Sequence, residues 1–340
     1  MKYIYLLSTM ALLVMAVLFS AACLAPQPRY SISTVPAQGQ PTSVQVIPAS
    51  MWLKVPDTNI SNCWLEGPAF DRNGDLYFVD KLQHNIFKVG MADKTLRVFY
   101  GNPKWTFNSV KIHKDGRLFI CCMFEHTVLV LNPDGSYSEE INLYSDHGPL
   151  FPNDMIFNGA GDFYFTAFNK YLPTGGVYRV GADAHKAKIR FDDAIAKRLK
   201  DPNGISLSPD GKYLWVGEGD TRVEHRFELA ADGKSAINDL QYRIPSAVPG
   251  GPDSNQVDSA GNVYQAMSGG GCLAVMSSQD RLIAQVALPA DQGRDQYLGT
   301  SNVAFQPGTD TGYIVTSGYG GGAVLTFKGL SVGPTLYSHQ

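Results

Sequence analysis

Six oxygen-bearing side chains recur at nearly even spacing along this chain of 340 residues. Each stands four residues before the last apolar residue of a segment that ends in a tight turn, as in LEGPAFDRNG and PNDMIFNGAG. Because the flanking sequence repeats with them, we expect the positions to be structurally equivalent. They are 42 to 50 positions apart and comprise Glu66, Asn108, Asn153, Asn203, Asp253 and Ser301.

Carboxylate and amide oxygens that meet at one point favour a hard cation. Ca²⁺ takes roughly six to eight oxygen ligands and mixes carboxylates, amides and water. A buried carboxylate is costly unless it is paired or binds a cation, and no Lys or Arg occupies any of the six positions. Mg²⁺, Mn²⁺ or Zn²⁺ could substitute, zinc least readily because the set contains neither His nor Cys. The alternative is that Asn and Asp at strand starts only cap the backbone locally.

A cation open to water would polarise a carbonyl or phosphoryl oxygen and stabilise the oxyanion that follows. Asp253 would then serve as nucleophile or as general base for water, and Asp154 is the next candidate. No Ser-His-Asp triad is indicated, since Ser254 does not lie in a G-x-S-x-G elbow. The other candidates, as substrate contacts or outer positions of the site, are Asn108, Ser254, Ser301, His126 and Tyr171.

The repeats that carry these residues predict a β-propeller. Residues 64–80, WLEGPAFDRNGDLYFVD, contain two β-forming segments joined by a turn in which Gly74 can adopt a positive φ. Six copies of about 40–50 residues, rich in short strands, are typical of propeller blades. We therefore predict an all-β, six-bladed propeller in which the first strand of each blade lines a central channel.

Closure of the ring requires a contribution from the N-terminal segment. The last blade shows three clear strands, and Ser43–Pro48 precedes the first blade and is rich in β-formers. We expect an N-terminal strand to complete the last blade, which removes an exposed sheet edge. The propeller domain is accordingly assigned to residues 43–340. Strand alternation predicts that His84, His126 and His147 lie on the ligand-binding top face and His113 in a bottom turn.

The first 42 residues read as export and attachment signals. Residues 1–22 combine Lys2 with an apolar run and predict a signal peptide, and FSAAC predicts that Cys23 becomes the acylated N-terminus. Ordinary cleavage near Ala22 or Ala25 is the alternative. Residues 23–42 are rich in Pro, Ser and Gln and are assigned as a tether. We expect an exported protein, attached to a bacterial membrane only through this lipid or signal, that faces the periplasm or exterior.

Charge and cysteine content exclude other classes. Lys plus Arg number 28 and Asp plus Glu 31, and no basic run stands out, so nucleic acid is not an expected partner. Cys121 and Cys122 are adjacent in a strand and should face opposite ways. The four cysteines of the domain form no C-x-x-C pair and are interpreted mainly as small buried residues, while a disulfide between Cys63 and Cys272 stays open.

Four segments resemble a family of calcium-dependent propellers. WLEGPAFD, PNDMIFN, DPNGISLSPDGKYLWV and GGPDSNQVDSAGNVYQAM look like motifs of the senescence-marker-protein/gluconolactonase/LRE-like family, with bacterial drug-responsive lactonases the most similar group. The resemblance extends from about Leu65 to Lys328. It implies one catalytic Ca²⁺ held by Glu66, Asn153, Asn203 and Asp253, with Asp253 also catalytic and Ser254 assisting.

The same resemblance implies calcium-dependent hydrolysis of a lactone, a cyclic carboxylic ester, as the activity. Some relatives bind a second, structural Ca²⁺ through the loop between the second and third strands of blade two, but the loop here, CMFEH, lacks the expected ligands. Relatives with the same ligands include phosphotriesterases, so a phosphotriesterase-like hydrolase is one alternative. A non-catalytic binding propeller stabilised by calcium is the other. A small-molecule lactone or ester is the expected partner.

Overall fold

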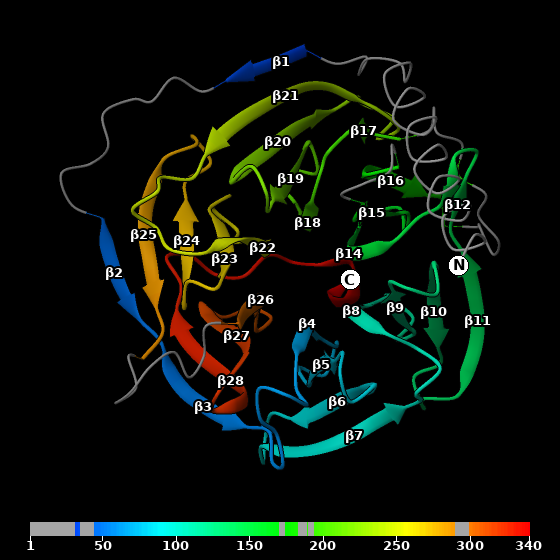
Figure 1. Ribbon diagram of the computed structural model, residues 1–340, viewed down its shortest axis with the longest axis vertical. Helices are drawn as coiled ribbons and strands as arrows, with labels where there is room; N and C mark the ends of the chain where they lie inside the picture. The colour runs from blue at the N-terminus through cyan, green and yellow to red at the C-terminus, as the bar shows by residue number, and fades with distance from the viewer. Residues whose placement is uncertain (1–30, 35–43, 170–173, 183–188, 190–193, 290–298) are drawn as a thin grey trace, which may run out of the picture.

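The computed structural model describes residues 31–34, 44–169, 174–182, 189, 194–289 and 299–340. Its strands form six mainly antiparallel sheets of four or five strands arranged around a central axis, and a small two-stranded hairpin (Figure 1). This arrangement confirms the predicted all-β, six-bladed propeller. Residues 1–30, including the predicted signal and Cys23, and Tyr171 lie outside the described residues. No helix among the described residues is long and apolar enough to cross a membrane.

Each blade runs outward from the axis in chain order. In blades one to three the strands are β4 (Leu65–Phe70), β5 (Leu76–Asp80), β6 (Asn85–Gly90) and β7 (Thr95–Gly101); β8 (Phe107–Ile112), β9 (Leu118–Cys122), β10 (Thr127–Leu131) and β11 (Tyr137–Asn142); and β14 (Pro152–Phe157), β15 (Phe163–Ala167), β16 (Gly176–Val180) and β17 (Ala196–Lys197). A small hairpin, β12 (Tyr144–Ser145) and β13 (Gly148–Pro149), links blades two and three.

The other three blades recruit strands from the N-terminal segment. Their own strands are β18 (Pro202–Leu207), β19 (Tyr213–Glu218), β20 (Val223–Leu229) and β21 (Ala236–Arg243); β22 (Gly251–Val257), β23 (Val263–Ser268), β24 (Cys272–Met276) and β25 (Leu282–Ala287); and β26 (Gly299–Phe305), β27 (Thr311–Gly318) and β28 (Gly321–Lys328). The outer strand of blade six is β3 (Ser50–Lys54), antiparallel to β28, which confirms closure by an N-terminal strand.

Two further N-terminal strands add to the outside of the ring. Gln45–Pro48 forms β2, which pairs in parallel with β25, so this β-rich segment extends blade five and the strand after it closes blade six. Ser31–Thr34, inside the range predicted as a tether, forms β1 parallel to β21. The N-terminal segment thus runs along the outer edges of three successive blades (Figure 1).

The hydrophobic core consists of six clusters, each between two neighbouring blades. The second strands of the blades, such as β5 and β9, are buried on both faces, because each blade packs against a blade on either side. Cys121 packs between blades two and three and Cys122 between blades one and two, so their side chains face opposite ways as predicted. The four described cysteines are buried and unpaired, which excludes the Cys63–Cys272 disulfide in this structure.

Every inner strand contains a register shift near its upper end. The pairing slips between Glu66 and Ala69 in β4 and between Pro252 and Asn255 in β22, and the four other inner strands slip at equivalent positions. A β-bulge of this kind bends the strand and re-aims its side chains, and bulges are common beside active sites. The six predicted positions therefore coincide with six local distortions of the sheet.

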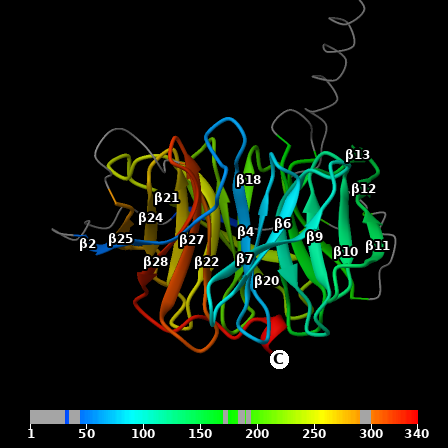
Figure 2. The ribbon, with the colours of Figure 1, turned by 90° about the horizontal axis from the view of Figure 1, so that it is seen from below.

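The C-terminal segment crosses the bottom of the ring. Val332 O accepts a hydrogen bond from Ser259 N in blade five, and the Tyr337 ring lies against Phe157 of blade three. At the chain end, Arg72 in blade one donates to Gln340 O at 2.7 Å. Figure 2 shows this end, with the 3-10 turn η2 (Tyr337–His339), opposite the long loop between β3 and β4.

Blade four contains a buried histidine between two carboxylates. The Nδ1 atom of His225 lies 3.0 Å from Asp239 Oδ2, and its Nε2 atom lies 3.6 Å from Glu218 Oε2. Burial lowers the pKa of His225, but the hydrogen bonds and charges of Asp239 and Glu218 outweigh it and raise the pKa to about 9. Phe227 stacks on the imidazole. The charged histidine therefore ties β19, β20 and β21 together.

We predict that this cluster makes stability fall at alkaline pH. Because the pKa of His225 rises on folding, its contribution is complete below about pH 6.5 and is lost as pH rises through about 9. Urea unfolding of the wild type and His225→Gln should therefore show a stability difference at pH 6 that shrinks by up to about 3 kcal/mol at pH 10, at about 1.4 kcal/mol per pKa unit. A difference independent of pH would contradict the charged state.

Candidate active site

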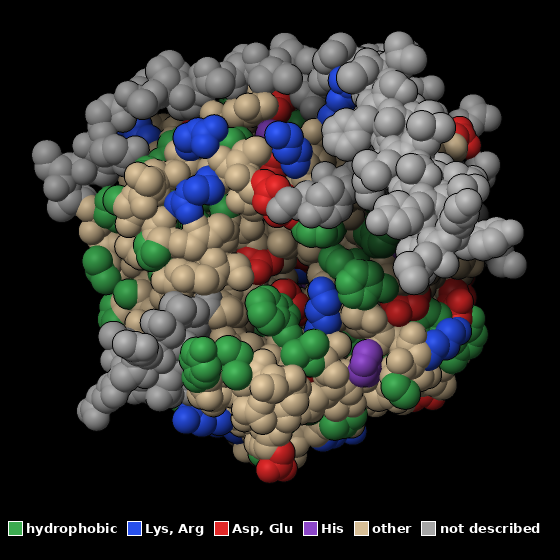
Figure 3. Space-filling model, in the orientation of Figure 1, with side chains coloured by type: hydrophobic (Ala, Val, Ile, Leu, Met, Phe, Trp, Pro, Cys, Tyr) green, Lys and Arg blue, Asp and Glu red, His purple; other side chains and the backbone are tan. Residues whose placement is uncertain are grey.

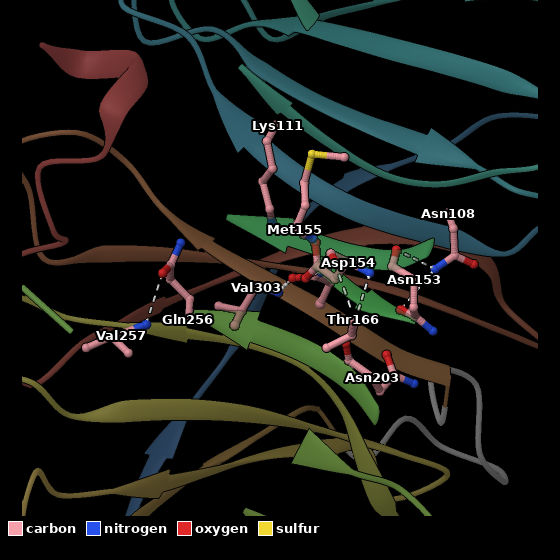
Figure 4. Close-up of polar contacts among 11 residues, drawn as sticks. Asn108, Lys111, Asn153, Asp154, Met155, Thr166, Asn203, Gln256, Val257 and Val303 are labelled. Carbon is pink, nitrogen blue, oxygen red and sulfur yellow. Dashed lines mark hydrogen bonds and ion pairs between the residues drawn. The ribbon is translucent and has the colours of Figure 1, made fainter. Parts of the chain in front are cut away.

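Two of the predicted oxygen side chains are in direct contact near the upper end of the channel. The carboxamide nitrogen Nδ2 of Asn108 donates to Asn153 Oδ1 at 3.1 Å and to Asn153 O at 3.0 Å, joining blades two and three. Figure 4 shows these two side chains pointing toward each other, with Asn203 beside Thr166. Glu66, Asn108, Asn153 and Asp253 are each 3 to 6% exposed, so the set is largely withdrawn from water.

Two of these residues are carboxylates within range of each other's charge. Burial and then the charge of Asp253 raise the pKa of Glu66 well above its usual value. Burial raises the pKa of Asp253 to about 7, against the opposing effects of Ser268 and Lys81. Like charges in a dry site disfavour ionisation. The two carboxylates thus need an additional positive charge to be ionised together.

An unpaired amide oxygen stands in the same set. Asn203 Oδ1 is buried and has no hydrogen-bond partner among the described residues. The backbone of Asn203 is held from blade three, because the Thr166 hydroxyl donates to Asn203 O. A buried acceptor without a donor is unfavourable, and a bound cation or water would satisfy it. Asn203 is therefore positioned to offer its oxygen to a ligand.

The charged group nearest this set is Lys81, which follows β5 in the turn above blade one. Its ammonium Nζ donates to Asn108 Oδ1 at 2.7 Å. Burial lowers the pKa of Lys81, while the charges of Glu66 and Asp253 act in the opposite direction. Asn108 therefore directs its nitrogen to Asn153 and its oxygen to Lys81.

The residues around the set fix its backbone. Leu65, beside Glu66, is held through both backbone polar groups: its nitrogen donates to Ser317 Oγ, and its carbonyl accepts from Ser301 Oγ. Gln265 Nε2 donates to the carbonyls of Asp253 and Ser254 at 2.8 and 3.2 Å. These bonds hold the bulged segments in one conformation.

Glycines allow the inner strands to approach closely. A Cβ on Gly67 would lie 2.4 Å from Ser109 Cα, and one on Gly204 would lie 2.4 Å from Ser254 Cα. Gly67 also has a φ of +52°, a conformation that most L-residues disfavour. Both glycines directly follow a predicted ligand, so they bring each ligand near the next blade.

The remaining predicted residues have more varied surroundings. Ser301 donates to backbone carbonyls of Leu65 and Val315 and so acts on Glu66 indirectly. Asp154 is fully buried and paired with Lys111 Nζ at 3.1 Å (Figure 4). His126 places Nδ1 against Leu150 O and packs on Phe151. Ser254 is buried beside Asp253.

Aromatic and aliphatic side chains surround the opening of the channel. Trp64 is 38% exposed and donates Nε1 to Glu66 Oε1 at 3.1 Å, and Phe124 is 59% exposed and lies beneath the Lys81 ammonium. Figure 3 looks onto this face and shows a central hollow with acidic, basic and hydrophobic side chains at its edge. The opening thus combines exposed apolar side chains with charged ones. Further exposed residues in the loops of this face are Ile60, Leu82 and Tyr319.

Four positioning residues escaped the sequence prediction. Lys81 lies in a turn outside the repeated segment, and Thr166, Gln265 and Ser317 lie in second strands. The signal for the latter three is a polar residue within an otherwise apolar, fully buried strand, as in FYFTA and VYQAM. No comparable pattern marks Lys81.

The residues fit an oxygen-bound cation. Among the described residues there is no group of three or more His, Cys, Asp or Glu side chains that could hold a metal ion. The ligands of the predicted site include only two carboxylates, Glu66 and Asp253, and the others are amides. Two buried carboxylates whose pKa values are raised, chiefly by burial, together with the unpaired Asn203 Oδ1, are what Ca²⁺ would satisfy. Glu66, Asn153, Asn203 and Asp253 are the residues that would hold it.

Comparison with known proteins identifies the family of this chain. The model of the SMP-30/gluconolactonase/LRE-like region matches residues 64–318. The chain belongs to this family. A relative from Staphylococcus epidermidis described as lactonase drp35 is 36% identical over 326 residues, which cover 91% of this chain and 96% of the relative.

Solved structures show the same fold. A calcium-binding protein, regucalcin, from Agrobacterium tumefaciens superposes with a TM-score of 0.66 at 16% identity, covering 86% of this chain and 99% of that one. A gluconolactonase from Xanthomonas campestris gives 0.62 at 20% identity, covering 85% and 99%. At these identities the likeness concerns the fold, and the family assignment rests on the sequence matches.

We predict unequal roles for the two amides of blades two and four. Asn203→Ala should weaken Ca²⁺ binding more than Asn108→Ala, by about tenfold or more, because Asn203 Oδ1 is unpaired whereas Asn108 Oδ1 already accepts from Lys81. Isothermal titration of Ca²⁺ into both variants measures this difference. Equal losses would indicate that Asn108 also ligates the ion directly.

Proposed function

We propose that this protein hydrolyses a lactone at a Ca²⁺ ion bound in the upper channel. The supporting observation is the set formed by Glu66, Asn153, Asn203 and Asp253, with two carboxylates and an unpaired amide oxygen, in a chain 36% identical to a lactonase over nearly its whole length. A phosphotriester would use the same ligands, so the two substrate classes must be separated by experiment.

The chain's own residues supply the remaining parts of the reaction. When bound, the ion would polarise the lactone carbonyl and stabilise the oxyanion. Asp253, as general base, takes a proton from the attacking water. It returns that proton to the ring oxygen as the C–O bond breaks, which yields a hydroxy acid and restores the carboxylate. Gln265 holds the backbone of Asp253 in place during both transfers.

The site also supports the proposal through its environment. The walls of the channel are packed β-sheets, and low-dielectric surroundings strengthen interactions with charge that develops in the transition state. The apolar side chains at the opening, Trp64 and Phe124 among them, suit the carbon skeleton of an organic ester. We further propose export and lipid attachment through Cys23, so that hydrolysis takes place outside the cytoplasm.

The proposed function predicts calcium-dependent turnover of cyclic esters. Purified protein should open γ- and δ-lactones in the presence of Ca²⁺ and lose activity on chelation, because Glu66 and Asp253 alone cannot polarise the carbonyl. Initial rates on lactones, linear esters and phosphotriesters, with Ca²⁺ or with EDTA, measure this. Faster phosphotriester turnover would favour a phosphotriesterase, and calcium-dependent stability without turnover of any ester would favour a binding propeller.

The two carboxylates should respond differently to added calcium. Both Glu66→Gln and Asp253→Asn remove one charge and keep an oxygen, so both should bind Ca²⁺ more weakly. Saturating Ca²⁺ should restore turnover by Glu66→Gln but leave Asp253→Asn slower by about 10²–10⁴-fold, the usual effect of losing an acid–base group. Lactone turnover across a Ca²⁺ titration measures this. Full rescue of Asp253→Asn would reduce Asp253 to a ligand.

A further inference from the structure

Lys81 is held firmly at the edge of the candidate site. Its backbone nitrogen donates to Trp64 O, and the turn that contains it is anchored by Asp80, a fully buried residue. Asp80 Oδ1 accepts hydrogen bonds from the backbone nitrogens of Leu82 and Gln83 at 3.0 and 3.2 Å. The same oxygen accepts from Trp64 N at 3.1 Å. A turn with this many side-chain contacts fixes the starting point of the lysine stem.

The side chain is then directed inward. The ammonium lies 2.7 Å from Asn108 Oδ1 and 5.7 Å from the centroid of the Phe124 ring. Phe124 is exposed and lies beneath the ammonium, and a cation over an aromatic face is favourable. Lys81 therefore extends across the opening from blade one to blade two and ends beside the oxygen set.

The charges of the site become unbalanced when a divalent cation binds. In the metal-free protein, the Lys81 ammonium offsets part of the negative charge of Glu66 and Asp253. A bound divalent cation neutralises Glu66 and Asp253, the two carboxylates whose charges act on the Lys81 ammonium, so these no longer offset it. Asn108, its hydrogen-bond partner, is a neutral amide and does not cancel that charge. An uncompensated cation in a half-buried site attracts an anion.

We propose that Lys81 is an anion-binding residue of this site, which binds a carboxylate beside the metal ion. This inference rests on the proposed function, because opening a neutral lactone produces a carboxylate at the metal. The carboxylate comes either from the product or from an acidic substituent on the substrate. In both cases Lys81 contributes one charge-assisted hydrogen bond, donated by Nζ to a carboxylate oxygen.

Removing the charge of Lys81 should change the affinities for Ca²⁺ and for a carboxylate in opposite directions. Lys81→Met keeps an apolar side chain of similar length but deletes the ammonium. Ca²⁺ should bind this variant about tenfold more tightly, because a repelling charge is lost, whereas 4-hydroxybutyrate should bind the Ca²⁺-loaded variant about tenfold more weakly. A purely structural lysine would weaken both or neither, so the opposite signs are diagnostic.

A second lysine, in the segment between β7 and β8, provides a matched control variant. Lys104 also lies over an aromatic ring, that of Trp105 at 4.0 Å, but pairs with Glu140 on the surface. Isothermal titration of Ca²⁺, and of 4-hydroxybutyrate into Ca²⁺-loaded protein, should be run on the wild type, Lys81→Met, Lys81→Arg and Lys104→Met. Lys104→Met should match the wild type, and Lys81→Arg should retain carboxylate binding. Thermal unfolding confirms that each variant is folded.

The outcomes separate this proposal from the function on which it rests. A wild type that binds no Ca²⁺ contradicts the metal centre itself. Ca²⁺ binding with equal 4-hydroxybutyrate affinity in the wild type and Lys81→Met overturns the role of Lys81 alone. Kinetics distinguish the two sources of the carboxylate. If Lys81→Met raises the KM for a lactone that carries a carboxyl group but not for γ-butyrolactone, Lys81 binds an acidic substituent of the substrate. If Lys81→Met instead reduces inhibition by the hydroxy-acid product, Lys81 binds the product carboxylate.

Discussion

The burial of two carboxylates at one end of the channel is the constraint around which this protein is arranged. Glu66 and Asp253 come from blades one and five, and neither can be fully charged in a dry site without a cation. The fold brings them together because six blades close on one axis. The energy for this comes from the six hydrophobic clusters between blades, which make the ring rigid enough to hold like charges near one another.

The β-bulges in the first strand of each blade allow the repeated segments to form a site. In a regular strand alternate residues face opposite sides, so one residue per strand would reach the axis at a given height. The register shift in each inner strand lets successive residues serve different purposes. In blade three, Asn153 joins the oxygen set, whereas Asp154 forms an ion pair with Lys111. Ser301 and Gln265 then lock the bulged backbone with hydrogen bonds.

Periodicity was sufficient to predict the blades and to place the six oxygen side chains on their inner strands, because these follow from spacing and strand-forming residues. It did not predict what each oxygen contacts. Ser301 and Asn108 occupy equivalent positions, yet the Ser301 hydroxyl bonds to backbone and the Asn108 oxygen to Lys81. Such differences arise from side chains of neighbouring blades, which no local pattern encodes. The course of the N-terminal segment was predicted only in part, since Gln45–Pro48 and Ser50–Lys54 have similar β-forming sequences and join different blades.

The C-terminal segment gives the channel a floor. It passes from blade five to blade one across the lower ends of the inner strands, with Tyr337 against Phe157 and Gln340 held by Arg72. The segment thus lies across the lower end of the channel, and the candidate site lies toward the upper end. A ligand is therefore expected to enter and leave at the upper end, and under the proposed function a product that stays bound there would also obstruct the next substrate.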